Sequence, residues 1–417
     1  MTMSSRMNRR ALWWAVIAGV ALRIAYVLFY PQMGVHADAA CYDALGWSLA
    51  QGQGYHLPGE APDVYWAPGY PAFLAAVYAV AGHSLTAARI AQALLGGAQI
   101  WLVGRIGTRA FTPRIGVLGA WACALYLPFI GYTGLFLTET LYATLLVLAT
   151  DGLMTMAERP TAARAIWLGA LAGLTSLVRA ETVLLPLFTV AGLWLVWRHR
   201  STSLVQWALL YGVAALAVLP WAARNYRVTG EFIPLTVHGG DVLWISTYPA
   251  EWLELDTERE PFRSIVAGKT QAQASKALRA AGIRNIIEHP GAYVWMSAKR
   301  APRLWLSGHS NAFDGMLDSI GDYWRRGQRA VAGVKAGMLV ANTLLVLAGF
   351  AGAVAMMTRT GAAGRLRWIV VAPVVFTTAL HIVLFAAPRF HVPIMPFMLI
   401  FAAALWWREV YGEESPA

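Results

Sequence analysis

An acidic residue in the first polar stretch of the sequence has the surroundings of a catalytic base. Asp38 follows an apolar run by a few residues, and aromatic residues follow it in the same stretch: Tyr42, Tyr55, Tyr65 and Trp66. A carboxyl group beside a membrane and covered by aromatic side chains can have a raised pKa, which suits a general base. The alternative is a solvated residue that caps the following helix. The same two interpretations apply to Asp43, one helical turn further on.

Glu139 is the second acidic candidate. It lies in the stretch Leu137-Thr-Glu-Thr-Leu, at the end of an apolar run. A carboxylate without a partner is costly so close to hydrocarbon, so this residue needs either a partner or a function. The alternative is an acid in the first turn of a helix, stabilised by the helix dipole, with Thr138 as the cap.

Three arginines are expected at the same level of the membrane as these acids. Arg179 precedes Glu181 in a short joint between apolar runs, and Arg224 and Arg389 lie at the ends of other runs. Because guanidinium pairs with phosphate through two parallel hydrogen bonds, these residues would suit an anionic headgroup beside a base. The alternatives are an ion pair between Arg179 and Glu181, and arginines that extend to lipid headgroups.

Several common catalytic motifs are absent from the sequence. It has no Walker-type loop, no Cys-x-x-Cys pair, no His-Glu-x-x-His and no Gly-x-Ser-x-Gly, so ATP hydrolysis, structural zinc, zincin and serine-hydrolase chemistry lack their residues. Cys41 in an expected loop and Cys123 in an expected span are not expected to pair. His381 lies inside an apolar run, either as a hydrogen-bonded core residue or as part of a pocket.

The composition shows which elements must position these residues. Of the 417 residues, 58% are hydrophobic and 13% are charged, and this charged fraction is about half that of an average soluble domain. The remaining surface must therefore face lipid. The net charge of +11 comes in large part from arginines in short loops between apolar runs. Membrane topology explains that pattern, and nucleic-acid binding is not expected.

The apolar runs predict an all-α polytopic membrane protein. About ten runs are long enough to cross roughly 30 Å of hydrocarbon. The first is interpreted as a retained signal anchor, because it is too long for a signal peptide and ends without a cleavage site. The run at 68–81 is short and begins with prolines, so it is expected to form a re-entrant or juxtamembrane helix. The expected spans are 11–30, 85–104, 115–133, 135–156, 163–180, 181–197, 204–220, 334–357, 368–386 and 392–407.

Arginines recur in every second short loop, which places those loops in the cytoplasm. The alternation holds only if 68–81 does not cross the membrane. The first loop, 31–68, and the segment 221–333 then share the outer face with the acidic candidates. The arginines of the expected cytoplasmic loops are, in order along the chain, Arg6, Arg9 and Arg10; Arg105, Arg109 and Arg114; Arg159 and Arg164; Arg198 and Arg200; and Arg359, Arg365 and Arg367.

Three parts of the chain follow from this topology. Residues 1–220 form a catalytic membrane module that includes the first outer loop, and 334–417 form the last membrane helices. Residues 221–333 form a soluble periplasmic domain between them. Its first residues, 232–237, favour a strand, while 268–288 and 291–305 favour helices. A small α+β domain is therefore expected.

Taken in order, short motifs along the chain resemble a known family. They occur near both ends and in the middle, and the match covers nearly the whole chain in order. The set is similar to bacterial membrane glycosyltransferases of the protein O-mannosyltransferase and aminoarabinose (lipid A) transferase kind, which belong to the glycosyltransferase C superfamily. The motifs include Asp38-x-x-x-Tyr42, Ala67-Pro-Gly-Tyr-Pro, Leu137-Thr-Glu-Thr-Leu, Gly173-Leu-Thr-Ser-Leu-Val-Arg179, Pro220-Trp-Ala-Ala-Arg-Asn-Tyr, Gly239-Gly-Asp-Val-Leu-Trp and Pro388-Arg-Phe-His-Val-Pro.

The resemblance implies an enzyme of the bacterial inner membrane whose active site faces the periplasm. Such enzymes take a sugar from a polyprenyl phosphate and pass it to an acceptor that enters from the periplasm, and an acid of the first outer loop lies at the reaction centre. In this sequence that residue is Asp38. Many relatives have Asp-Glu where this chain has Asp38-Ala39, a basic residue in place of Trp66, and an acid near Met395. The identity of the sugar and the use of a metal therefore cannot be carried over.

The available residues predict an inverting transfer. A sugar phosphodiester already carries a good leaving group, so one base and positive charge for the phosphate are sufficient. We expect Asp38 to be the base and Glu139 to orient the acceptor or a cation, which would be Mg²⁺ or Mn²⁺ if a metal is used. The acceptor is a hydroxyl or phosphate of lipid A, another glycan, a lipid or a protein. The expected phosphate contacts are Arg179, Arg224 and Arg389, and the expected pocket residues are Tyr42, Tyr55, Tyr65, Trp66, Tyr70 and His381.

Two other classes of function compete with this interpretation. A secondary transporter or flippase of lipid-linked sugars also carries charged residues along its path, but it predicts broken, charged helices near the middle of the membrane. A non-enzymatic scaffold of the cell envelope would have no groove that joins the outer loop to lipid. Convergence of Asp38, Glu139 and the three arginines on one cavity is the feature that would favour the enzyme.

Overall fold

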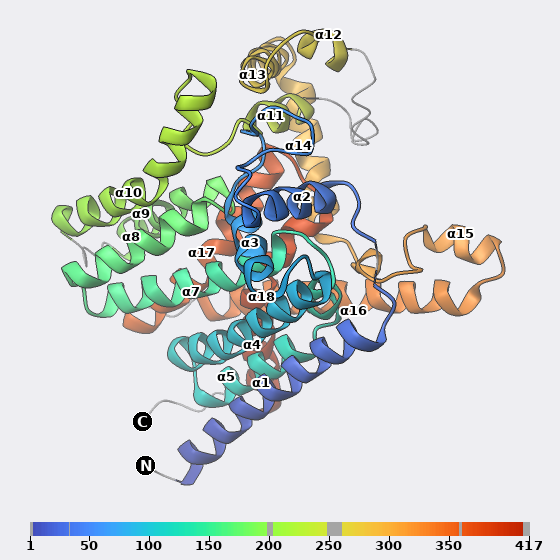
Figure 1. The fold of residues 1–417 in the computed structure, drawn as a ribbon. Coiled ribbons are helices and arrows are strands. Elements are labelled where there is room, and N and C mark those ends of the chain that lie inside the picture. Colours follow the sequence, from blue (N-terminus) through green and yellow to red (C-terminus); the bar gives the residue numbers. More distant parts are fainter. Residues whose placement is uncertain (1–2, 33, 198–202, 248–260, 358–360, 412–417) are drawn as a thin grey trace.

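The computed structural model describes residues 3–32, 34–197, 203–247, 261–357 and 361–411, and the fold in this part of the chain is helical (Figure 1). Short 3-10 helices are η1 (Ala180–Leu184), η3 (Ser310–Ala312) and η4 (Pro388–Ile394). The α-helices are α1 (Met3–Phe29), α2 (Asp38–Ala50), α3 (Gly69–Ala81), α4 (Leu85–Ala110), α5 (Pro113–Leu125), α6 (Leu127–Thr133), α7 (Glu139–Glu158), α8 (Ala162–Ser176), α9 (Leu185–Trp197), α10 (Leu204–Thr229), α11 (Gly239–Ile245), α12 (Phe262–Val266), α13 (Gln271–Glu288), α14 (Pro290–Trp305), α15 (Ile320–Arg325), α16 (Arg329–Met357), α17 (Gly361–Val383) and α18 (Met395–Tyr411).

Several of these helices are long and apolar enough to cross a membrane, so the chain is a multi-pass membrane protein. Within the described residues six helical segments meet that condition, in α1, α7, α10, α16, α17 and η4 with α18, and the bent pair of α5 and α6 would be a seventh. Helices α8 and α9 have only 15 and 13 residues. The expected count of about ten spans stays a prediction. Arg198, Arg200 and Arg359 of the expected cytoplasmic loops lie outside the described residues.

The expected span 115–133 is bent by 51° where α5 meets α6. Pro128 in the first turn of α6 cannot donate a backbone hydrogen bond, so the carbonyl groups at the end of α5 need other partners. Arg23 of α1, which is 1% exposed, supplies them by donating to the carbonyl oxygens of Cys123 and Ala124, both at 3.2 Å. Gly96 leaves room for this side chain, because an added Cβ would lie 2.6 Å from its Nε. The arginine thus stabilises the bend.

Helices α2 and α3 pack together in the first loop and position Asp38. With 13 residues, α3 is about 20 Å long, less than the hydrocarbon thickness. This length agrees with a helix that does not cross. Gly69 at its start donates its N–H to the carbonyl oxygen of Leu177 at 2.7 Å, and an added Cβ would lie 2.8 Å from the Leu177 carbonyl carbon. Only glycine allows this close approach between α3 and the joint that carries Arg179.

The segment after α10 contains no strand in its described residues, so the expected α+β domain is wrong in its β part. The carbonyl groups of Ile233 and Leu235, which would pair with another strand, accept hydrogen bonds from side chains of α10. Asn225 donates to Ile233 at 3.0 Å and Trp221 donates to Leu235 at 2.7 Å. Pro234 between them has no N–H to donate. The β-prone residues are therefore fixed as an irregular strap along α10.

The remaining outer helices form a small group at one end of the molecule. Figure 1 shows α11, α12 and α13 together at the top with α14 below them, near α2, while the start of α1 lies at the bottom. Gly240 of α11 faces Ser275 of α13, whose hydroxyl donates to the Val237 carbonyl oxygen at 2.5 Å. This helical group covers the side of the molecule on which Asp38 lies.

Candidate active site

Five charged side chains from four separate segments form one chain of ion pairs. Asp38, at the start of α2, contacts Arg389 of η4 with 2.6 Å between Oδ2 and Nη2. Arg389 Nε lies 3.8 Å from Glu139 Oε1, at the start of α7. Glu139 Oε1 is 3.2 Å from Arg179 Nη2, and Arg179 Nη1 is 3.8 Å from Glu181 Oε1. We call these residues the ion-pair chain. The structure thus brings together Asp38, Glu139 and two of the three arginines.

Exposure differs along the ion-pair chain. The side chains of Asp38 and Arg389 are 33% and 37% exposed, whereas Glu139 is 2% exposed. The chain holds three carboxylates and two guanidinium groups, so it has a net charge of −1 when all are ionised. Solutes therefore reach it from the Asp38 side, and Glu139 supports it from the protein side.

Glu139 is the first residue of α7, where the helix dipole favours an acid, but Thr138 does not cap the helix as the alternative interpretation expected. Thr138 makes no capping hydrogen bond to the helix, and its hydroxyl oxygen instead accepts from Arg179 Nε at 3.3 Å. Both arginines approach Glu139 Oε1, and the buried Oε2 has no hydrogen-bond partner in the described residues. A buried acceptor without a partner is costly. This oxygen is therefore available to a ligand.

Asp38 does not cap the following helix, as the alternative interpretation of the sequence expected. It is the first residue of α2, and the N-cap position is occupied by Ala37, which makes no side-chain cap and has a φ of +50°. A positive φ is unfavourable for alanine because its Cβ crowds the backbone. The turn is held in this conformation, and it places the Asp38 carboxylate against Arg389.

Aromatic rings fix the guanidinium group of Arg179. The group lies between the rings of Tyr142 and Phe390, at 5.2 and 5.0 Å from their centroids. Phe390 also stacks on His381, with 4.5 Å between centroids. Because His381 Nδ1 contacts the Phe385 carbonyl oxygen at 2.9 Å, Nδ1 carries the proton, and the buried Nε2 has no partner in the described residues. Phe390 thus contacts both His381 and Arg179 of the ion-pair chain.

An aromatic wall stands beside the exposed end of the ion-pair chain. Tyr42 packs edge-on against Trp66 and Tyr70, with centroids 5.0 and 5.3 Å apart. Trp66 in turn contacts Tyr65 at 5.1 Å and His238 at 6.1 Å. Burial, followed by the negative charge of Glu139, raises the pKa of Tyr42 far above its usual value, so its hydroxyl stays protonated. The aromatic wall comprises Tyr42, Tyr65, Trp66, Tyr70 and His238.

Arg224 and Tyr55 hold the first loop in place. Arg224 donates to the Tyr55 carbonyl oxygen at 2.8 Å and to the Asp63 carbonyl oxygen, and its guanidinium lies 4.9 Å from the Trp221 ring centroid. The Tyr55 hydroxyl donates to the Trp66 carbonyl oxygen at 3.0 Å. Among the described residues, Arg224 has no ion pair or hydrogen bond with the ion-pair chain. The structure therefore separates Arg224 from the other two arginines.

Asp43 belongs to a different cluster. Its carboxylate accepts a hydrogen bond from Tyr78 at 2.5 Å and contacts His83 Nε2 at 3.0 Å. The His83 ring stacks on Trp47 with 4.8 Å between centroids. These contacts join α2 to the end of α3 and account for Asp43 without a catalytic role.

His238, in the aromatic wall, and Asp241 next to it were not singled out from the sequence. Burial raises the pKa of Asp241 to about 6, although a hydrogen bond from Tyr65 acts in the opposite direction. Burial lowers the pKa of His238 to about 4, and the charge of Asp38 partly opposes this effect. His238 Nδ1 lies 3.9 Å from Asp241 Oδ2, too far for a hydrogen bond. The Gly-Gly-Asp stretch with its neighbouring histidine was the available sequence signal.

Metal use stays a prediction. The described residues contain no group of three or more His, Cys, Asp and Glu side chains arranged to hold a metal ion. Asp38 and Glu139, the expected ligands, both face the guanidinium group of Arg389, at 2.6 and 3.8 Å. A cation that bound both carboxylates would have to displace that group.

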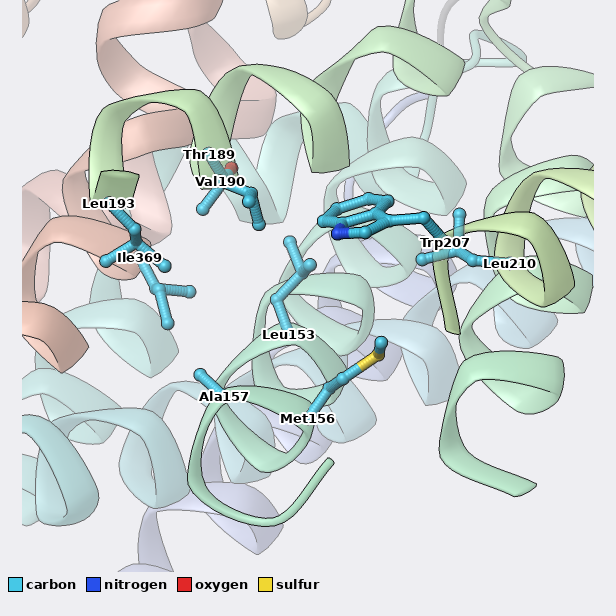
Figure 2. Close-up of a pocket in the computed structure, with 9 residues that line it drawn as sticks. All are labelled: Leu153, Met156, Ala157, Thr189, Val190, Leu193, Trp207, Leu210 and Ile369. Carbon is cyan, nitrogen blue, oxygen red and sulfur yellow. The ribbon is translucent and has the colours of Figure 1, made fainter. Parts of the chain in front are cut away.

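An apolar hollow lies away from the ion-pair chain, between α7, α9, α10 and α17 (Figure 2). Its volume is about 10 Å³, room for about one water molecule. None of the predicted site residues lines it, and the one hydroxyl group in the wall, of Thr189, donates to the Leu185 carbonyl oxygen. The lining residues are Leu153, Met156, Ala157, Thr189, Val190, Leu193, Trp207, Leu210 and Ile369.

Comparisons with known proteins agree with this architecture. Residues 65–223 match a family described as dolichyl-phosphate-mannose-protein mannosyltransferase, and no curated protein sequence matches the chain. The oligosaccharyltransferase of Archaeoglobus fulgidus in the apo form aligns with 98% of this chain and 53% of its own, at 14% identity and a TM-score of 0.58. The chain has the glycosyltransferase C fold. ArnT from Cupriavidus metallidurans in the apo state aligns with 97% of this chain and 78% of its own, at 16% identity and a TM-score of 0.48.

A third structure extends the comparison. Archaeal oligosaccharyltransferase AglB from Archaeoglobus fulgidus was solved in complex with an inhibitory peptide and a dolichol-phosphate. It aligns with 100% of this chain and 53% of its own, at 13% identity and a TM-score of 0.58. The chain thus spans about half the length of this oligosaccharyltransferase. The family match includes Glu139 and Arg179 but neither Asp38 nor Arg389. The fold match and the partial family match agree with the resemblance seen in the sequence.

Proposed function

We propose that the protein is an inverting glycosyltransferase of the bacterial inner membrane that moves a sugar from a polyprenyl phosphate to an acceptor hydroxyl at the periplasmic face. The observation that carries the proposal is the contact between the exposed Asp38 carboxylate and the Arg389 guanidinium, at 2.6 Å. A base and a phosphate-binding group are thereby adjacent. A structure of the same fold was solved with a dolichol-phosphate, which supports a lipid-phosphate donor.

Arg389 has two roles in this proposal. Without substrate it pairs with Asp38, so that Oδ2 of the carboxylate faces the guanidinium group and not an acceptor hydroxyl. A donor phosphate that binds Arg389 through two hydrogen bonds would replace Asp38. Asp38 would then be free to accept a proton. Donor binding would therefore precede activation of the acceptor.

The transfer step then involves one proton and two bonds. Asp38 accepts the proton of the acceptor hydroxyl while the oxygen attacks the anomeric carbon from the side opposite the phosphate. The bond from that carbon to the phosphate oxygen breaks, and the polyprenyl phosphate leaves with the electron pair. Arg389 and Arg179 stabilise its negative charge. Attack from the opposite side inverts the anomeric carbon.

Glu139 and the aromatic wall position the reacting groups. Glu139 lies between the two guanidinium groups, so it keeps both at a fixed spacing from the protein side. The rings of Tyr42 and Trp66 offer apolar faces to the sugar next to Asp38. Arg224 has no part in phosphate binding in this proposal, because it is bonded to carbonyl groups of the first loop.

A transfer assay with matched variants tests the proposal. The full chain, purified and reconstituted in lipid, is given labelled polyprenyl-phosphate sugars, and both transferred sugar and released polyprenyl phosphate are measured. Asp38→Asn is expected to reduce transfer by about 10² or more while the protein remains folded. Asp43→Asn removes the same charge from the same helix and is expected to retain transfer.

Two outcomes would contradict the proposal. Near-wild-type transfer by Asp38→Asn would show that Asp38 is not the base. Movement of a lipid-linked sugar across the bilayer without release of polyprenyl phosphate would instead favour the flippase. Mass analysis of envelope glycans and glycoproteins in a deletion strain, compared with the Asp38→Asn strain, then identifies the acceptor.

A further inference from the structure

A second hollow, which is polar, lies at the opposite end of the membrane helices from the ion-pair chain. Its volume is about 440 Å³, and it lies between α1 and α4. Along α1 it is separated from Phe29, near the Asp38 loop, by roughly 24 Å of helix after Trp13. We call it the arginine hollow. Its lining residues are Arg9, Leu12, Trp13, Trp101, Arg105, Thr108 and Arg109.

The positive charge of the arginine hollow is only partly neutralised. Asp151 of α7 contacts both Arg105, at 3.0 Å, and Arg109, and Glu158 contacts Arg109 at 3.0 Å. Arg9 is exposed and has no hydrogen bond or ion pair among the described residues. Three guanidinium groups thus face two carboxylates. The hollow therefore carries a net positive charge, which a bound anion would neutralise.

The arginines are arranged to bind that anion. Arg105 is bonded to Asp151 through Nε, at 3.0 and 3.1 Å from the two carboxylate oxygens, and its side chain is 44% exposed. In the described contacts its two terminal nitrogens have no partner. Because Asp151 is 12% exposed and holds both Arg105 and Arg109, the orientation of these side chains is fixed before any ligand binds.

The apolar part of the hollow distinguishes a lipid from a free anion. Trp13 and Trp101 are 48% and 36% exposed, and the Arg105 guanidinium lies 5.7 Å from the Trp101 ring centroid. Tryptophan is typical of the level where lipid headgroups meet the hydrocarbon. Leu12 adds an apolar contact on the same wall. A free phosphate would leave these surfaces unused, whereas the glycerol and first acyl carbons of a phospholipid would cover them.

We propose that the arginine hollow binds the phosphate headgroup of an anionic glycerophospholipid, on the face of the membrane opposite the candidate active site. Basic pockets between membrane helices bind such headgroups. The phosphate contacts Arg9 and Arg105, and the glycerol region lies between Trp13 and Trp101. Since Arg9 belongs to α1 and Arg105 to α4, the lipid joins the two helices.

Retention of lipid by the purified full chain tests this proposal. The protein in detergent is incubated with phosphatidylglycerol or with phosphatidylcholine of the same acyl chains, and bound lipid is counted by native mass spectrometry. Phosphatidylglycerol is expected to bind and to raise the thermal midpoint, and phosphatidylcholine is not. Arg9→Gln is expected to weaken phosphatidylglycerol binding by roughly five-fold, the effect of one surface arginine near an anionic lipid.

A neighbouring arginine supplies the matched control. Arg10→Gln removes the same charge from the same turn of α1, but Arg10 does not line the hollow, so lipid binding is expected to persist. Equal losses in both variants would show that only the general positive charge matters and would overturn the proposal. Equal binding of phosphatidylcholine would do the same. If inorganic phosphate alone raised the thermal midpoint as much as phosphatidylglycerol does, the hollow would be a site for a free anion and the lipid proposal would be overturned.

Discussion

The proposed exchange at Arg389 predicts that removing the base tightens donor binding. In wild type, donor phosphate must displace Asp38 from Arg389, and the side chains of this pair are 33% and 37% exposed. Solvent screens an ion pair of that exposure, so it is worth roughly 0.4–1 kcal/mol. Asp38→Asn removes this competition. The variant is therefore expected to bind polyprenyl phosphate about two- to five-fold more tightly, although its transfer rate falls by about 10² or more.

Binding is measured on the detergent-purified chain with undecaprenyl phosphate, by displacement of a fluorescent analogue at fixed ionic strength. Asp43→Asn is the control, because it removes one negative charge from the same helix while Asp43 is bonded to Tyr78 and His83. Its affinity is expected to equal that of wild type. Unchanged or weaker binding by Asp38→Asn would refute the exchange. Equal tightening by both variants would show only a long-range charge effect.

Three further predictions concern groups that surround the site. Arg224→Gln is expected to lower the thermal midpoint and leave the affinity for polyprenyl phosphate unchanged; a selective loss of affinity would return Arg224 to the phosphate site. The folded-state pKa of Asp241, about 6, lies above its ordinary value of 3.8. The stability that the raised pKa contributes is thus fully present below pH 3.8 and lost as the pH rises through 6. In unfolding experiments Asp241→Asn should therefore gain about 2 kcal/mol relative to wild type between pH 4 and pH 7. An equal difference at both pH values would contradict this. Arg23→Met should destabilise the fold by about 2–4 kcal/mol, because the buried carbonyl groups of Cys123 and Ala124 lose their donor. An unchanged thermal midpoint would show that water replaces the guanidinium group.

Much of the candidate site follows from the sequence because it depends on topology. Asp38, Glu139, Arg179 and Arg389 each lie at the end of an apolar run, and alternation of basic loops assigns all these ends to one face. Proximity follows from that assignment, since helices of one bundle end side by side. The pairing itself does not follow: no pattern shows that Arg389 contacts both acids.

Other features depended on contacts that a linear pattern does not carry. Arg224 resembles the other outer arginines in sequence, but its partners are carbonyl oxygens, which every residue possesses. The residues from 232 to 237 favour a strand, yet Trp221 and Asn225 occupy the carbonyl groups that a strand would use. The bend near Pro128 is tolerated because a distant residue, Arg23, supplies donors.

The close backbone contact between Gly69 and Leu177 has a consequence for the evolution of specificity. Main-chain atoms on both sides set the spacing between α3 and the Arg179 joint, so side-chain replacements elsewhere leave that spacing unchanged. The distance between the start of α3 and Arg179 is therefore fixed by the main chain. Trp66 and His238, by contrast, lie between helices, so their side chains can be replaced without changing that distance. In the proposed function, the sugar that is accepted would thus change through Trp66 and His238, while the proposed phosphate contacts Arg179 and Arg389 stay the same.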